Sequence, residues 1–171
     1  QEADHVPVIP VLLLQGAKAL GLTLAQYFQS HENIAKGQEA LVEKYGHDGV
    51  FGIPHVVEDV EPFGGEISYS DCGAPTLAKM AWRNWNDLEN ARVPNPKEHP
   101  ALVRTLSTID RVAKKFKGKK LSIGGAIAPF SLPSMLIGTE KWLELLLWEE
   151  ELIREPICKK TMGICKEFCV A

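Results

Sequence analysis

The chain has 171 residues, of which 45% are hydrophobic and 24% charged, and its formal net charge is −3 at pH 7. These values are typical of a globular protein that is long enough to bury one hydrophobic core. The small negative charge gives no basic field for nucleic acid or an anionic membrane, and no run of about 18 apolar residues predicts a membrane-spanning helix. We therefore expect one domain over residues 1–171, with neither nucleic acid nor a membrane as partner.

The N-terminus and the cysteines indicate the compartment. The first ten residues, QEADHVPVIP, lack the basic stretch and the cleavage site of a signal peptide. The four cysteines, at positions 72, 158, 165 and 169, do not have the arrangement of a secreted disulfide framework. We predict a cytoplasmic protein. Because residue 1 is not methionine, we also expect the chain to be part of a longer gene product.

The first third of the chain alternates apolar runs with helical patterns. VPVIPVLLL, residues 6–14, is apolar on both faces, which is typical of a fully buried parallel strand. Thr23 is expected to cap a helix that runs through Phe28. The patterns then predict a helix over 32–45 and a second buried strand over 48–54.

The remaining elements are predicted in the same way. Residues 58–71 predict a short helical turn and then a strand at 66–70, whereas 82–96 is a polar stretch of low regularity. Apolar residues follow a helical stripe from Pro100 to Lys117. The next strand is expected at 120–128, and helices are expected at 131–137, 139–153 and 155–170.

Buried strands that alternate with amphipathic helices predict an α/β fold with parallel strands. An open doubly wound sheet and a (β/α)8 barrel are the two candidates. The doubly wound fold usually has a glycine-rich phosphate turn after its first strand, but QGAKALG does not fit the pattern G-x-G-x-x-G. The pattern therefore favours the (β/α)8 TIM barrel, whose active sites lie where the strands end.

Three segments, in order along the chain, resemble the uroporphyrinogen decarboxylase superfamily. VPVIP resembles its first strand, and YGHDGVFGIPHVVEDVEPFGGEI resembles its second strand and the following turn. GGAIAPFSLPSMLIG resembles its G-x-P-[FW]-T-L signature, with Ala128 in place of the glycine and Ser131 in place of the threonine. The resemblance implies a TIM barrel. Because the chain has about four strand–helix units and closure needs eight, it would cover roughly the first half of that barrel.

This superfamily has two branches, the decarboxylases and the corrinoid-dependent methyltransferases, and departures from the decarboxylase pattern indicate to which of them the chain is more similar. A porphyrinogen with eight carboxylates requires arginines near the first strand, but the first arginine here is Arg83. The aspartate expected under the pyrrole nitrogens corresponds to His55, and the tyrosine expected after the Pro-Phe-Ser turn corresponds to Met135. The chain therefore most resembles the corrinoid- and zinc-dependent methyltransferases, of the methylcobamide:coenzyme M methyltransferase type.

This resemblance implies a cofactor and several partners. A zinc ion would bind the acceptor's thiol and lower its pKa, so that the thiolate attacks the methyl group of a methylcorrinoid. The family holds zinc with a His-x-Cys pair and a later cysteine, and since no His-x-Cys occurs here, we expect the zinc ligands beyond residue 171. The expected partners are a corrinoid protein or free methylcobamide, a thiol or folate acceptor and, to cover an open barrel edge, a second copy in a homodimer. The alternatives are uroporphyrinogen decarboxylase itself and a non-catalytic scaffold that binds a corrinoid protein.

Four residues are candidates for the site, and none is expected to bind a metal. His55 follows a buried strand and can hydrogen-bond a ligand, or it can be a structural histidine. Gln15 can donate to a ligand at the end of the first strand, or close the barrel rim. Glu58 can act as an acid, although an acidic helix N-terminus is the simpler interpretation. Ser131 is more simply a helix cap than a nucleophile, because no paired base is evident.

Overall fold

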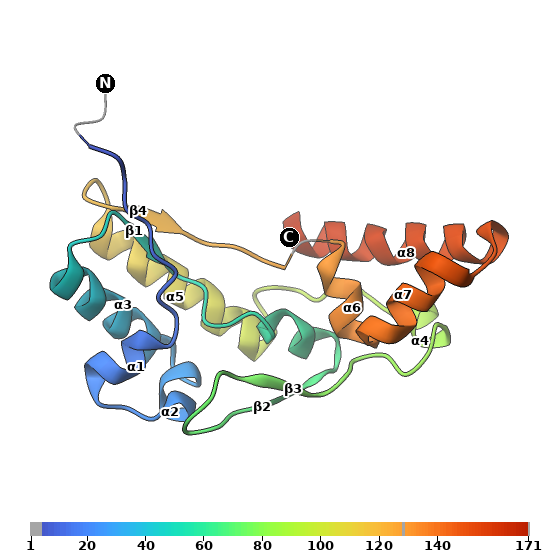
Figure 1. Cartoon of the computed structure of the whole chain (residues 1–171), viewed down its shortest axis with the longest axis horizontal. Coiled ribbons are helices and arrows are strands. Elements are labelled where there is room, and N and C mark those ends of the chain that lie inside the picture. Colours follow the sequence, from blue (N-terminus) through green and yellow to red (C-terminus); the bar gives the residue numbers. More distant parts are fainter. Residues whose placement is uncertain (1–4, 128, 171) are drawn as a thin grey trace. The chain divides into compact units, whose positions relative to one another are not determined.

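The computed structural model describes residues 5–127 and 129–170, apart from the side chain of Glu89. The chain is α/β and divides into two compact units, which Figure 1 shows with their helices and strands. Unit 1 consists of Gln1–His55, Tyr69–Pro75 and Arg104–Gly125, and unit 2 consists of Val56–Ser68, Thr76–Val103 and Ala126–Ala171. The prediction of a single domain stays a prediction.

Unit 1 contains two parallel strands and the helices that pack around them. Its strands are β1 (Gly49–Phe51) and β4 (Leu121–Ile123), which pair in parallel from Gly49 with Leu121 to Phe51 with Ile123. Its helices are α1 (Gln15–Leu20), α2 (Leu24–Phe28), α3 (His31–Tyr45) and the part of α5 (Pro100–Phe116) that begins at Arg104. The parallel pairing of strands predicted at 48–54 and 120–128 is confirmed, although each strand is only three residues long.

Local signals in the sequence fix the ends of the helices in unit 1. The Thr23 side chain accepts a hydrogen bond from the backbone N–H of Gln26, whose own side chain accepts from the N–H of Thr23, which forms a capping box before α2. Ser30 caps α3 by accepting from the N–H of Asn33. Gly46 ends α3 with a φ of 68°, a conformation that glycine adopts without strain. The helices predicted after Thr23 and over 32–45 are therefore confirmed.

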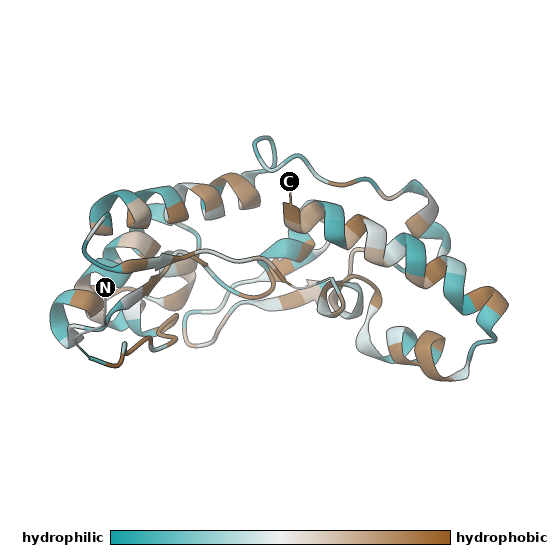
Figure 2. Cartoon of the chain, turned by 90° about the horizontal axis from the view of Figure 1, so that it is seen from above, coloured by the Kyte–Doolittle hydropathy of each residue, from teal (hydrophilic) through white to brown (hydrophobic). Residues whose placement is uncertain are grey.

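Two groups of buried side chains form the core of unit 1. One lies between β1, α3 and α5 and contains Ala35, Val42, Val50, Val112 and Phe116. The other lies between the first three helices and contains Ala17, Tyr27, Phe28 and Ile34. Figure 2 shows the corresponding pattern, in which hydrophobic and hydrophilic bands alternate along the helices.

The prediction of a buried strand at 6–14 is wrong. This segment contains no strand in the structure, and Val6, Val8 and Val11 are exposed. Pro7 and Pro10 have no backbone N–H and cannot complete a ladder of hydrogen bonds. Instead Asp48 binds both backbone groups of Val8, because its N–H donates to the carbonyl oxygen at 2.8 Å and its carboxylate accepts from the N–H at 3.0 Å.

Unit 2 contains a short hairpin and a group of helices. Its elements are the 3-10 helix η1 (Glu58–Phe63), β2 (Glu66–Ser68), β3 (Thr76–Lys79), α4 (Asn86–Asn90), α6 (Ser131–Ile137), α7 (Thr139–Trp148) and α8 (Glu151–Val170). β2 and β3 pair antiparallel. The buried core brings together η1, α4, α6, α7 and α8 through residues such as Val60, Leu88, Leu132, Trp142 and Phe168.

The boundaries in unit 2 follow the predictions in part. The helical turn after residue 58, the strand within 66–70 and the helix at 131–137 are confirmed, as is the helix of the 100–117 stripe, which continues into unit 1. The break between α7 and α8 lies at Glu149, whose backbone is extended, and not next to Pro156, which lies inside α8. The short elements α1, β3 and α4 were not predicted. None of the helices in the described part of the chain is long and apolar enough to cross a bilayer.

Candidate functional site

His55 follows β1 at the carboxyl end of the strand. The intervening Gly52 donates its N–H to the carbonyl oxygen of Ile123 at 2.8 Å, which extends the pairing of β1 and β4 by one bond. A Cβ at Gly52 would lie 2.8 Å from the Cα of Ile109 in α5, so only glycine allows this close approach. Helix and strand together therefore set the direction in which the chain leaves β1 toward His55.

The His55 side chain is 5% exposed and lies between two aromatic rings of unit 1. The rings of Phe28 and Tyr69 both meet it edge to face, with ring centroids 5.6 Å and 5.7 Å away. The Tyr69 hydroxyl lies 3.4 Å from His55 Nε2, and Arg104 Nη2 donates to the same hydroxyl at 3.2 Å. We call these four residues, Phe28, His55, Tyr69 and Arg104, the His55 cluster.

The hydrogen bonds of the His55 cluster define the protonation of the imidazole. A guanidinium can only donate, so the Tyr69 hydroxyl gives its own proton to Nε2 and the ring proton of His55 is assigned to Nδ1. Burial, together with the positive charge of Arg104, lowers the pKa of His55 to about 4. The imidazole is therefore neutral at pH 7 and is a weak base.

The His55 cluster combines an imidazole, a phenol and a guanidinium with an aromatic wall, and none of its four side chains is a carboxylate. Such a set can orient a polar or anionic ligand through its hydrogen-bond donors. Sequence reasoning identified His55 but missed Tyr69 and Arg104. They come from the loop after β2 and from α5, and no spacing in the sequence connects them to His55.

The other predicted site residues lie in both units. Gln15 begins α1 and is exposed, and it does not end a strand. Glu58 begins η1 and is 1% exposed. Ser131 begins α6 and is exposed, but Phe130 occupies the N-cap position and no side chain caps the helix, so the capping interpretation is wrong. The functional roles of Gln15, Glu58 and Ser131 stay predictions.

A second polar arrangement, in unit 2, holds the backbone that follows β4. The Asp59 carboxylate accepts a hydrogen bond from the N–H of Ile127 at 2.6 Å, and Cys169 Sγ donates to the carbonyl oxygen of Ile127 at 3.2 Å. Burial raises the pKa of Asp59, and this hydrogen bond opposes the shift. Both backbone groups of Ile127 are thus fixed from η1 and α8. Ala128, the next residue of the signature, lies outside the described residues.

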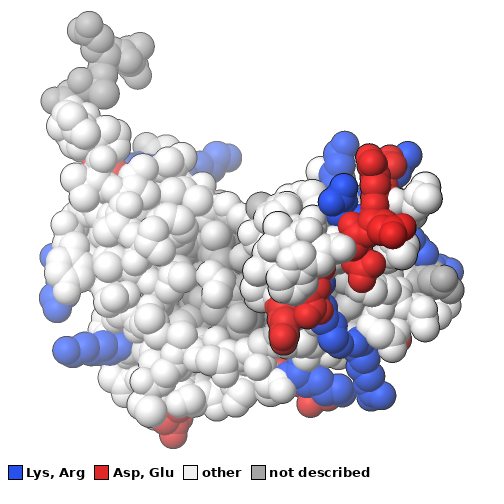
Figure 3. All heavy atoms as spheres, turned by 45° about the vertical axis from the view of Figure 1, so that its right-hand side comes forward, with Lys and Arg blue, Asp and Glu red and all other residues white. Residues whose placement is uncertain are grey.

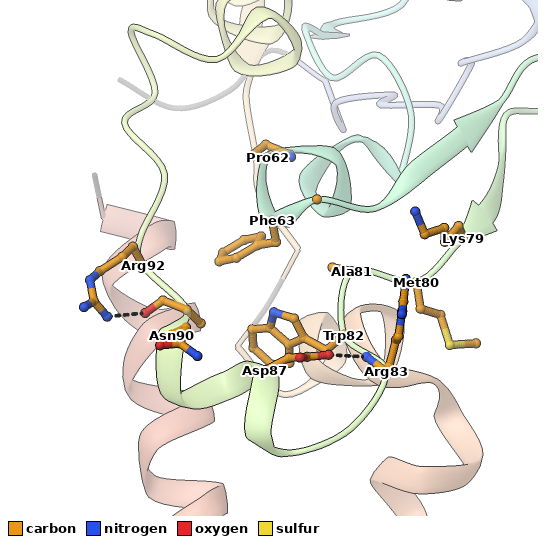
Figure 4. Close-up of a pocket in the computed structure, with 12 residues that line it drawn as sticks. Pro62, Phe63, Lys79, Met80, Ala81, Trp82, Arg83, Asp87, Asn90 and Arg92 are labelled. Carbon is orange, nitrogen blue, oxygen red and sulfur yellow. Dashed lines mark hydrogen bonds between the residues drawn. The ribbon is translucent and has the colours of Figure 1, made fainter.

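Unit 2 also has a hollow of about 550 Å³ between η1, β3 and α4, which Figure 4 shows. Phe63 and Trp82 meet edge to face in it, with centroids 6.3 Å apart. Polar groups at its rim already have partners in the chain. Asp87 accepts a hydrogen bond from the N–H of Arg83 at 2.7 Å, and Lys79 forms a salt bridge with Glu66 at 2.5 Å. In Figure 4 the Arg92 side chain points away from the aromatic rings, so the cations do not converge on one point.

The distribution of charge and of metal-binding side chains limits the chemistry of the described residues. Figure 3 shows Lys and Arg side chains intermixed with Asp and Glu where charges gather, and no single sign of charge covers the visible face. Within residues 5–127 and 129–170, no group of three His, Cys, Asp or Glu side chains could hold a metal ion. Of the cysteines in α8, Cys165 is buried in the core, whereas Cys158 is half-buried and Cys169 is exposed.

Comparisons with known proteins agree with the resemblance found in the sequence. The model of the family described as uroporphyrinogen decarboxylase (URO-D) matches residues 1–171. Among solved structures, a methyltransferase from Methanosarcina mazei superposes with a TM-score of 0.79 at 20% sequence identity, over 96% of this chain and 49% of that one. The chain thus spans about half the length of this solved structure. The comparison with curated proteins gave no match.

The fold follows from these comparisons and from the parallel pair of strands. The chain is α/β and makes up about half of a (β/α)8 TIM barrel, as the sequence predicts. His55 follows a barrel strand at its carboxyl end, which is the end at which the active sites of this fold lie.

Proposed function

Because the chain belongs to the uroporphyrinogen decarboxylase family, we propose that it is part of a methyltransferase of that family, which moves a methyl group between a corrinoid and a thiol or folate acceptor. Two facts support transfer over decarboxylation. The solved structure that shares the fold is described as a methyltransferase. The chain also lacks the aspartate and the arginine-containing first segment that the decarboxylase resemblance implies.

The observation that carries this proposal is the neutral imidazole of His55 beside the guanidinium of Arg104. A decarboxylase needs a carboxylate to stabilise a pyrrole that becomes positively charged, and at the corresponding position this chain has an imidazole whose pKa is lowered to about 4. Because Arg104 lies beside it, a cation in this position would be repelled rather than stabilised. A thiolate acceptor, in contrast, suits the Nδ1–H assigned to His55 and the guanidinium of Arg104.

In this proposal the chain's own residues bind and orient, and they do not transfer protons. Methyl transfer would break the carbon–cobalt bond of the corrinoid substrate, leaving its electron pair on cobalt, and form a bond from the methyl carbon to the acceptor atom, whose proton would pass to solvent. His55 is too weak a base at pH 7 to deprotonate a thiol, so its role is to position a ligand, with Tyr69 and Phe28 fixing the ring. The zinc that the family resemblance implies has no ligand set among the described residues, and we assign it no step here.

The experiment measures demethylation of methylcobalamin by its change in absorbance, with and without 2-mercaptoethanesulfonate as thiol. We expect thiol-dependent demethylation that falls by at least about tenfold in His55→Ala, because a lost positioning hydrogen bond costs on the order of 1.4 kcal/mol or more. His47→Ala is the matched control, because His47 is also buried, at 4%, and lies at the other end of β1.

Three results would count against this assignment. If His47→Ala and His55→Ala lowered the rate equally per folded molecule, His55 would be structural. If the protein left methylcobalamin unchanged and released carbon dioxide from uroporphyrinogen, it would be a decarboxylase. An inactive protein that still bound a corrinoid protein would be the scaffold alternative.

A further inference from the structure

Three segments that lie far apart in the sequence meet at His55 in unit 1. His55 follows β1, Tyr69 follows β2, and Arg104 lies in α5. Arg104 Nη2 donates to the Tyr69 hydroxyl at 3.2 Å, and the same hydroxyl lies 3.4 Å from Nε2 of His55. The imidazole is buried, whereas Tyr69 and Arg104 are half-buried. These contacts are internal to unit 1, so they do not depend on what covers the surface of the chain.

The three side chains form a hydrogen-bond chain that runs in one direction. A guanidinium has only donors, so the Tyr69 hydroxyl accepts from Arg104 and gives its single proton to His55. In the reverse arrangement, Nε2–H of His55 would donate to a phenol oxygen that already accepts from Arg104. The phenol proton would then have no acceptor within the His55 cluster. Because a partly buried donor that loses its acceptor costs free energy, the hydrogen-bond chain favours the tautomer of His55 with the proton on Nδ1.

A fixed tautomer restricts what His55 can do toward a ligand. A neutral imidazole has one donor nitrogen and one acceptor nitrogen. The acceptor, Nε2, already receives the proton of Tyr69. The rings of Phe28 and Tyr69, which meet the imidazole edge to face, oppose a rotation that would exchange the two nitrogens. His55 can therefore donate to a ligand atom from Nδ1, but it accepts from a ligand only if its bond to Tyr69 breaks.

From this chain of hydrogen bonds, we propose that Tyr69, held by Arg104, is a positioning residue that restricts His55 to hydrogen-bond donation and thereby selects a ligand atom that accepts a hydrogen bond. Atoms of this class are a thiolate sulfur, a carbonyl oxygen and an oxygen of a carboxylate. An ammonium group in the same place would meet the Nδ1–H with its own N–H and would bind more weakly. The selection of the ligand rests on the proposed function, in which His55 positions a ligand, whereas the tautomer does not.

The first experiment measures the tautomer by NMR on the whole chain, labelled with ¹⁵N at the histidine rings. Correlations between the ring nitrogens and the carbon-bound ring protons show which nitrogen carries the proton, and the signals that disappear in His55→Gln identify His55 among the five histidines. At pH 7 we expect the proton on Nδ1. Tyr69→Phe keeps the ring but removes the donor to Nε2, so the form with the proton on Nε2 should gain about tenfold in relative population. Arg104→Met should cause a smaller shift in the same direction, because the phenol can then reverse its bond.

The matched control is Phe28→Leu, which removes an edge-to-face contact of the imidazole and leaves both hydrogen bonds in place, so the proton should stay on Nδ1. The second experiment measures ligand selection. In the demethylation assay, 2-aminoethanesulfonate, which has an ammonium in place of the thiol of 2-mercaptoethanesulfonate, is tested as an inhibitor. Tyr69→Phe should narrow the preference for the thiol over the ammonium by about tenfold. In the His55→Ala background, Tyr69→Phe should have little effect on this preference, because it acts through His55.

The two experiments fail in different ways. A proton on Nε2 in the natural protein, or an unchanged tautomer in Tyr69→Phe, would overturn the proposal. An unchanged tautomer in Arg104→Met would remove Arg104 from it, and a shift in Phe28→Leu as large as in Tyr69→Phe would show that packing sets the tautomer. An equal narrowing of the preference in the His55→Ala background would show that Tyr69 does not act through His55. If the protein demethylated no methylcobalamin, the proposed function would fail, and the NMR result would still decide whether Tyr69 fixes the tautomer.

Discussion

Gly37 in α3 lies where three elements of unit 1 meet, and Gly37→Ala tests how closely they pack. The added Cβ would lie 2.6 Å from Cε2 of Tyr27 and 2.9 Å from both the Tyr27 hydroxyl and the Cα of Gly16 in α1. The Tyr27 ring is fully buried and cannot move aside. Because one of the atoms is backbone, relief requires α1 and α3 to move apart.

Two opposing effects set the magnitude. Replacing glycine by alanine inside a helix contributes up to about 1 kcal/mol of helix propensity. Overpacking a well-packed core costs about 1–3 kcal/mol, and contacts below 3 Å with rigid atoms place this site in the upper part of that range. We expect Gly37→Ala to lower the free energy of unfolding by about 1–2 kcal/mol.

The assay is urea-induced unfolding followed by circular dichroism, with Gly163→Ala as the matched control. Gly163 is also helical, in α8, but a Cβ there would meet nothing within 4 Å, so this variant should gain up to about 1 kcal/mol. The two variants should therefore move the unfolding midpoint in opposite directions. If Gly37→Ala were as stable as Gly163→Ala, the close approach of α1, α3 and Tyr27 would be refuted.

Three further predictions concern titrating groups. The imidazole of His55 should titrate by NMR with a pKa near 4. Because this folded-state pKa lies below that of an unfolded histidine, the free energy of unfolding should be highest above about pH 6.5 and should fall as the pH drops toward 4. A measured pKa near 6.5 would contradict the burial of His55 and its contact with Arg104. Asp59 has a raised pKa, so its ionisation destabilises the folded protein as the pH rises through that pKa. Asp59→Asn keeps an acceptor for the N–H of Ile127, so its free energy of unfolding at pH 7 should equal or exceed that of the natural protein. Asp59→Ala removes the acceptor and should lower the free energy of unfolding in urea by about 1–3 kcal/mol. The pKa of Asp48 is lowered by its hydrogen bond from the N–H of Val8 and then by His5 and Lys120, so its contribution to stability is present above the ordinary aspartate pKa and is lost as the pH falls through the lowered value. Asp48→Ala, which removes the acceptor, should speed hydrogen exchange of the Val8 amide at neutral pH, and unchanged exchange would show that this carboxylate does not hold the segment.

The sequence predicts the elements whose signals are local. The cap at Thr23, the end of α3 near residue 45 and the helical stripe of α5 depend on residues a few positions apart, and all of them appear as expected. The segment 6–14 fails because apolar composition alone does not make a strand. A strand also needs backbone donors, and Pro7 and Pro10 remove two of them.

The site is predicted less well than the fold, because its residues meet through tertiary contacts. His55 is found from its place after a strand, but Tyr69 lies 14 residues from His55 along the chain, and Arg104 lies 35 residues from Tyr69. Ser131 is misplaced by one residue, because a serine before an apolar run resembles a cap, whereas the helix already begins at that serine. A single sequence has no signal that corrects either error.

Methyl transfer and decarboxylation are distinguished by giving one protein preparation both substrates in parallel. Methylcobalamin with a ¹³C-labelled methyl group is incubated with a thiol or a folate, and NMR follows the label, while carbon dioxide release is measured from uroporphyrinogen. We expect the label to move from cobalt to the sulfur or nitrogen of the acceptor and no carbon dioxide to be released. Carbon dioxide release with the label still on cobalt would contradict this expectation.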